Sequence, residues 1–105
     1  MAKYTFAYRG GGTPETPEEG ERVMAAWMSW YGSLGAAISD GGAPFGPSAS
    51  VSPGGAVASG APSGLSGFTI VSADSLAAAS EMARGCPVLD AGGSVDVYEC
   101  IDLQM

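Results

Sequence analysis

The stretch TPEEGERVMAAWMSWYGSLGAAI, residues 16–38, decides the fold because it predicts a long helix beside a sheet. Thr16 can cap the first turn with its hydroxyl, Pro17 suits the first helical position, and Glu19 completes a capping box. The pattern predicts a helix from about Pro17 to Ile38. Large apolar residues recur in it at steps of three and four and form one buried stripe: Val23, Trp27, Trp30, Tyr31, Leu34 and Ile38.

Two glycines interrupt this apolar helix, Gly32 and Gly35. Each costs roughly 1 kcal/mol relative to alanine inside a helix. We therefore expect them to allow a close approach of the helix to a sheet, which a side chain would block.

Strand patterns lie on both sides of the helix. Residues 3–9 alternate, with Tyr4, Phe6 and Tyr8 on one face, and residues 67–72 and 95–103 also predict strands. Asp74 is expected to cap a second helix that ends at Gly85. The buried stripe of that helix is predicted to contain four residues: Leu76, Ala79, Met82 and Ala83.

Residues 41–67 are almost entirely glycine, alanine, serine and proline, and no charged residue occurs between Asp40 and Asp74. Such a composition is compatible with a flexible linker. The turn signal Pro53-Gly54-Gly55 favours a loose hairpin, with strands at residues 48–52 and 56–59.

The order of these elements predicts one α+β domain over residues 1–105, with the ferredoxin-like split βαβ arrangement. Two helices can cover only one face of the sheet, and the other face carries side chains such as Tyr98 and Cys100. A second subunit that packs sheet against sheet would cover that face. We therefore expect a homodimer with the architecture of a dimeric α/β barrel.

The charge and composition exclude several classes of function. Eleven acidic and four scattered basic residues give a net charge of −7, which disfavours nucleic acid and anionic membrane surfaces as partners. The chain has no histidine, and Cys86 and Cys100 form no Cys-x-x-Cys pair, so we expect no metal site and no cofactor. With no membrane span or signal peptide in the pattern, a cytoplasmic protein with two free thiols is predicted.

Several stretches together resemble the YCII-related family of small dimeric proteins. They are AWMSWYG at residues 26–32, DGGAPFGP at 40–47, GFTIV at 67–71, ADSL at 73–76, GCPVL at 85–89 and GGSV at 92–95. The resemblance implies a dimeric α/β barrel and a small pocket at the end of the first helix. YciI-type members use a His and Asp pair, and the DGPF group carries Asp-Gly-Pro-Phe. This chain has no histidine, and Asp40 is followed by Gly-Gly-Ala-Pro-Phe.

The candidate site residues surround that pocket. Asp40 is the candidate acid–base residue, because a carboxylate shielded from water can have a raised pKa. Its alternative role is that of a turn residue that binds loop amides. The candidate ligand-binding residues are Tyr8, Trp27, Trp30, Tyr31 and Ser48.

Two functions follow from these residues. The first is a non-catalytic dimeric module that binds a small metabolite or a partner protein, which the missing histidine favours. The alternative is a small cofactor-free enzyme of the hydrolase, lyase or isomerase type, with Asp40 as acid or base.

Overall fold

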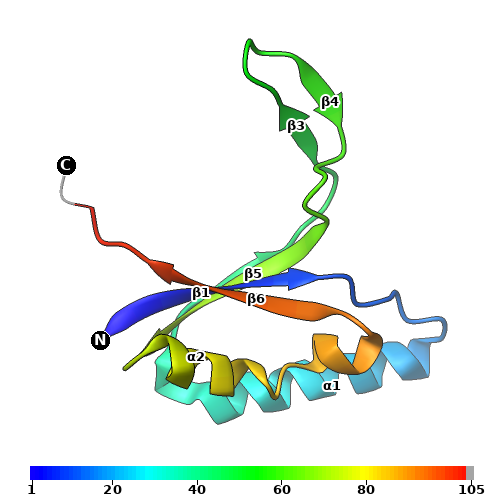
Figure 1. The fold of residues 1–105 in the computed structure, drawn as a ribbon. Helices are drawn as coiled ribbons and strands as arrows, with labels where there is room; N and C mark the ends of the chain where they lie inside the picture. The colour runs from blue at the N-terminus through cyan, green and yellow to red at the C-terminus, as the bar shows by residue number, and fades with distance from the viewer. Residues whose placement is uncertain (104–105) are drawn as a thin grey trace.

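A computed structural model describes residues 1–103 and contains two α-helices and six strands (Figure 1). The helices are α1 (Pro17–Leu34) and α2 (Leu76–Ala83), and two 3-10 turns are η1 (Gly35–Ala37) and η2 (Pro87–Ala91). The strands are β1 (Ala2–Arg9), β2 (Ile38–Pro44), β3 (Ala49–Val51), β4 (Val57–Ser59), β5 (Leu65–Ala73) and β6 (Ser94–Cys100).

Four of the strands form one antiparallel sheet in the order β2-β5-β1-β6. Both α-helices lie on one side of this sheet, and the β3–β4 hairpin rises on the opposite side (Figure 1). The fold is therefore a mixed α+β domain in which an antiparallel sheet is covered by helices on one face only.

The core lies between the sheet and the two helices. Phe6 of β1 and Val71 of β5 are completely buried there, together with the other residues that face the helices. The alternation predicted for β1 is confirmed, because its aromatic face points into this core. The cluster contains Tyr4, Phe6, Tyr8, Trp30, Val71, Ala73, Ala79, Ala83, Cys86 and Val88.

The predicted start of α1 is confirmed in detail. Thr16 Oγ1 accepts a hydrogen bond of 3.1 Å from the Glu19 backbone N–H, and Pro17 occupies the first helical position. Glu19 Oε2 accepts in return from the Glu15 N–H at 3.3 Å rather than from Thr16. The two side chains still accept hydrogen bonds from backbone N–H groups that have no partner within the helix, as in a capping box.

The predicted end of α1 at Ile38 is wrong. Gly35 has a φ of +54° and donates its N–H to the Tyr31 carbonyl, which ends the helix at Leu34. The chain then enters β2 at Ile38. The close approach expected at Gly32 and Gly35 is also wrong, because a Cβ at either position would meet no atom within 4 Å. Gly35 serves the helix end instead, where its positive φ favours glycine.

Other boundaries also differ from the prediction. Ser75 rather than Asp74 caps α2, since Ser75 Oγ accepts a hydrogen bond of 3.1 Å from the Ala78 N–H. The last strand ends at Cys100 and not at residue 103. The predicted hairpin is confirmed, but β3 and β4 form a separate two-stranded sheet, so β2 is the strand that completes the main sheet.

The face of the sheet that points away from the helices, called the outer face below, is partly apolar. The pairing of Thr5 with both Ile70 and Tyr98 places these three side chains in one row across it. Tyr98 is 61% exposed. At the edge of this face Phe45 stacks on Phe68, with ring centroids 5.8 Å apart. This is the face for which the sequence predicts a cover.

Candidate functional site

An open cleft of about 1080 Å³ lies beside the N-terminal half of α1. Its walls come from α1, the end of β1 with the loop after it, β2, the start of β5, and η2. Residues far apart in the chain meet here because the sheet brings their strands together. Strand β1 is central, β5 pairs with it, and β2 pairs with β5. The larger residues whose side chains face it are Tyr8, Val23, Met24, Trp27, Tyr31 and Val88.

Two glycines let the strands beneath the cleft pack closely. Gly42 has a φ of +72°, and a Cβ there would overlap the carbonyl oxygen of Phe68. At Gly67 a Cβ would lie 2.9 Å from the Ala43 carbonyl oxygen and 3.5 Å from the ring of Tyr8. Neither site has room for a side chain, so the backbone itself lines this part of the cleft.

Aromatic rings form one wall of the cleft. The rings of Tyr8 and Trp27 meet edge to face, with centroids 5.1 Å apart, and Trp27 and Tyr31 meet in the same way at 6.0 Å. Trp27 is half-buried, and within residues 1–103 its indole Nε1 donates no hydrogen bond to the protein. Trp27 therefore offers both a ring surface and a free N–H donor.

Trp30 belongs to the core and does not line the cleft. It is 6% exposed, stacks on Phe6 with centroids 5.9 Å apart, and donates its Nε1 hydrogen to the Met82 carbonyl at 3.0 Å. Gly85 leaves room for it, because a Cβ there would lie 3.2 Å from the indole. The ring thus joins α1 to both the sheet and α2.

A network of hydroxyl groups lies under the aromatic wall. Tyr8 donates a hydrogen bond of 2.7 Å to Oγ1 of Thr69, which is completely buried. Thr69 and Tyr31 both donate to the Gly41 carbonyl, at 3.2 and 3.1 Å, and their hydroxyl oxygens are 2.9 Å apart. Gly41 lies where the β2–β5 pairing is irregular. The network fixes the Tyr8 and Tyr31 rings against the end of α1 and against β2.

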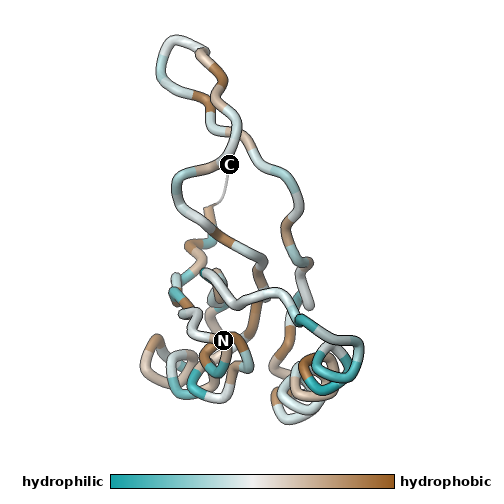
Figure 2. The backbone as a smooth tube through the Cα atoms, turned by 90° about the vertical axis from the view of Figure 1, so that its right-hand side faces the viewer, coloured by the Kyte–Doolittle hydropathy of each residue, from teal (hydrophilic) through white to brown (hydrophobic). Residues whose placement is uncertain are grey.

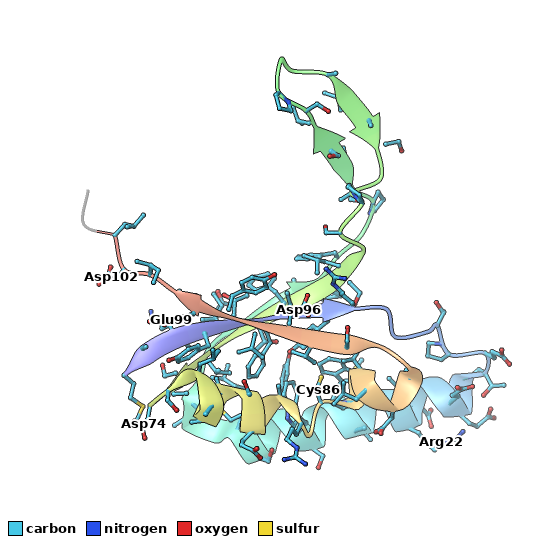
Figure 3. The ribbon with its side chains drawn as sticks, viewed as in Figure 1. Arg22, Asp74, Cys86, Asp96, Glu99 and Asp102 are labelled. Carbon is cyan, nitrogen blue, oxygen red and sulfur yellow. The ribbon has the colours of Figure 1, made fainter. Side chains whose placement is uncertain are left out.

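Burial controls the charge of the two titratable groups near this network. It raises the pKa of the Tyr8 hydroxyl far above its ordinary value of 10. It also raises the pKa of the Cys86 thiol from 9.0 to about 11, and Cys86 lies between the helices and the sheet (Figure 3). Both groups are therefore neutral at pH 7, and Cys86 supplies no thiolate nucleophile.

We expect the buried Cys86 thiol to make stability depend on pH. The unfolded chain releases this proton near pH 9 whereas the folded protein retains it to about pH 11. The free energy of unfolding should therefore fall as the pH rises from 9 to 11, and Cys86 should account for roughly 1 kcal/mol per pH unit of that fall. Below pH 9 the contribution of Cys86 to stability should be constant.

Urea unfolding at a series of pH values measures this slope. Cys86→Ala should give a shallower slope, and Cys100→Ala, which keeps Cys86, should retain the steep one. Equal slopes in the wild type and Cys86→Ala would contradict the assignment.

Three of the six predicted site residues lie at the cleft, and Trp30 lies in the core instead. Tyr8, Trp27 and Tyr31 meet at the cleft, whereas Asp40 and Ser48 are not among its lining residues. The exposed Asp40 accepts a hydrogen bond of 2.9 Å from the Gly42 N–H, which is the turn role. Ser48 Oγ accepts from the Ala61 N–H at 2.9 Å and lies at the base of the hairpin.

Ser48 lines a second, smaller hollow of about 450 Å³ with Phe45 and Leu65. Thr69 and the Gly41 carbonyl were not predicted as site groups from the sequence, although Thr69 lies in a predicted strand. The signal that could have identified Thr69 is its place as a polar residue on the strand face that packs against the helices, because a buried hydroxyl needs a hydrogen-bond partner.

Neither a cluster of metal ligands nor a membrane-spanning helix is found among the described residues. Across residues 1–103, no three acidic or cysteine side chains gather closely enough to hold a metal ion. In the same part of the chain, neither α-helix has the length and apolar character needed to cross a membrane. A scan against models of protein families finds no match, and a search of curated proteins finds no relative.

Proposed function

We propose that this domain is a non-catalytic dimeric module that binds a small molecule in the cleft beside α1. The observation that carries the proposal is the half-buried Trp27, which lines an open cleft of about 1080 Å³ and whose indole N–H has no protein acceptor within residues 1–103. Small-molecule sites are usually apolar hollows with a few polar groups that orient the ligand. A flat apolar ligand with a hydrogen-bond acceptor at its edge has the complementary chemistry.

Binding rather than catalysis is favoured by the state of the polar groups. The Tyr8 and Thr69 hydroxyls already donate to protein acceptors, and burial raises the pKa of Tyr8, which makes its ionisation harder still. Asp40, the acid–base residue of the enzyme hypothesis, is exposed and is held by the Gly42 N–H. The network therefore serves to hold the cleft wall in place.

The exposed area of the single chain supports the dimer. A compact monomer of this mass exposes about 5400 Å², whereas the chain exposes 7017 Å². The difference, roughly 1600 Å², is about twice the ~800 Å² that each partner buries in a standard interface. The partly apolar outer face, with Tyr98 exposed on its edge strand β6, is where we place the second copy.

The strand order β2-β5-β1-β6, with the helices on one face, supports the ferredoxin-like split βαβ arrangement. Two such sheets packed outer face to outer face would form the dimeric α/β barrel implied by the resemblance to the YCII-related family. Both cysteines are free thiols, which supports a reducing compartment such as the cytoplasm.

Binding of the dye 8-anilinonaphthalene-1-sulfonate tests the cleft. We expect one dye per chain, and Trp27→Ala should weaken binding by about tenfold because it removes the ring that the dye stacks on. Met28→Ala is the matched control, since Met28 lies next to Trp27 on α1 but is outside the cleft lining. Titration of dye emission measures both. Absence of binding, or equal weakening in the two variants, would contradict the ligand site.

A further inference from the structure

We propose that the β3–β4 hairpin, residues 47–64 and called the arm below, clasps a second copy of this chain. In this arrangement the valine-bearing face of each arm packs on the body of the other copy. The inference rests on the dimer of the proposed function, and it goes further by assigning the arm a role in it.

The arm stands away from the domain that carries it. It rises from the ends of β2 and β5 on the side of the outer face (Figure 1), and β3 and β4 pair only with each other. The radius of gyration is 15.3 Å, whereas a compact chain of this length has about 13 Å. The body of its own chain therefore does not cover the arm.

One face of the arm is apolar and unprotected. Val51 and Val57 are directly opposite each other in the hairpin, and they are 67% and 70% exposed. An isolated two-stranded hairpin is marginally stable in water, and it needs packing against another element. The paired valines are the surface through which such packing would stabilise the arm.

The absence of charge on the arm favours a second copy of the chain as its partner. Two copies that each carry −7 repel each other unless they meet through neutral surfaces. The arm has no charged residue, and on the outer face Arg9 pairs with Asp96 at 3.0 Å. The arm is mostly pale with apolar segments, whereas strongly hydrophilic segments are found on the body, including the helices (Figure 2). The arm and the outer face thus form one nearly neutral surface.

The position of the arm also suits a symmetric pair. Its root adjoins the outer face through the stacked rings of Phe45 and Phe68. When two outer faces pack about a twofold axis, both arms extend toward the partner's side and each contact occurs twice. A single substitution on the arm therefore acts at two places in the dimer.

Sedimentation of the double variant Val51→Asp/Val57→Asp across a concentration series tests the clasp. The wild type should sediment at twice 10.4 kDa. The variant should raise the dimer dissociation constant at least about tenfold, because it places charges in a desolvated contact. Met28→Asp is the matched control: Met28 is 68% exposed, but it lies on α1, away from the arm. It should leave the dissociation constant unchanged.

The possible outcomes test the clasp separately from the dimer and from the ligand site. A wild-type dimer that the double variant does not weaken would overturn the clasp and leave the dimer intact. A monomeric wild type would overturn both the clasp and the dimer, while dye binding decides the ligand site independently. Circular dichroism checks that the variants are folded. As a second measurement, elastase should cut the wild-type arm more slowly at concentrations above the dissociation constant, and a concentration-independent rate per molecule would overturn the clasp.

Discussion

Replacing Trp30 with alanine should lower the free energy of unfolding by about 3–5 kcal/mol, the range typical of a buried tryptophan. The ring is 6% exposed and contacts the sheet through Phe6 and α2 through the Met82 carbonyl. Its removal would leave a cavity at the junction of both helices with the sheet. Denaturant unfolding followed by circular dichroism measures the loss.

Met28→Ala on the same helix is the control, because Met28 is exposed and its loss should change stability by no more than about 0.5 kcal/mol. Trp27→Ala should fall between the two, since Trp27 is half-buried at the cleft. If Trp30→Ala and Met28→Ala had similar small effects, the core described here would be wrong.

Replacing Gly42 with alanine should have the second large effect. The φ of +72° alone costs a non-glycine residue roughly 1–3 kcal/mol. The added Cβ would also overlap the Phe68 carbonyl oxygen, so β2 would have to move away from β5. We therefore expect destabilisation at the upper end of that range, together with weaker dye binding because Gly42 lines the cleft.

Gly41→Ala is the matched control. A Cβ at Gly41 meets no atom within 4 Å, and this residue has no positive φ. Gly41 should therefore tolerate the change to alanine with little loss of stability. Denaturant unfolding of the two variants side by side checks the comparison, and equal stability would show that the close β2–β5 approach does not constrain position 42.

The sequence predicted best those features that depend on neighbouring residues. The start of α1 followed from Thr16 and Pro17, which act within one turn. The aromatic face of β1 followed from the alternation of Tyr4, Phe6 and Tyr8. The hairpin followed from Pro53-Gly54-Gly55, since turns of this kind are set by local backbone preference.

The strand β2 could not be predicted because nothing in its composition is typical of a strand. Residues 38–44 read ISDGGAP, with no alternation of apolar and polar side chains, and all but Ile38 are exposed. The strand exists because its backbone pairs with β5, a tertiary interaction between residues distant in sequence. This also explains why the sequence predicted that α1 continues to Ile38, since that residue fits the helical spacing equally well.

The candidate site was predictable only in part for the same reason. The spacing of Trp27 and Tyr31 placed both on one helix face, and the alternation in β1 gave Tyr8 a place opposite them. The Thr69 hydroxyl that joins Tyr8 and Tyr31 comes from β5. Asp40 lies in β2, which the sequence did not predict. The sequence could therefore not decide between a role for Asp40 in a turn and a role in the cleft.

The central position of β1 has a consequence for the synthesis of the chain. Strand β1 leaves the ribosome well before its partners, as seen in contacts that span 61 residues between Tyr8 and Thr69 and 95 residues between Thr5 and Cys100. Helix α1 and the hairpin rely on local contacts and can form early, but one edge of β1 waits for β5 and the other stays open until β6 emerges. A nascent chain halted before residue 94 would thus present an unpaired apolar strand edge, the type of surface that chaperones protect and that aggregates form on.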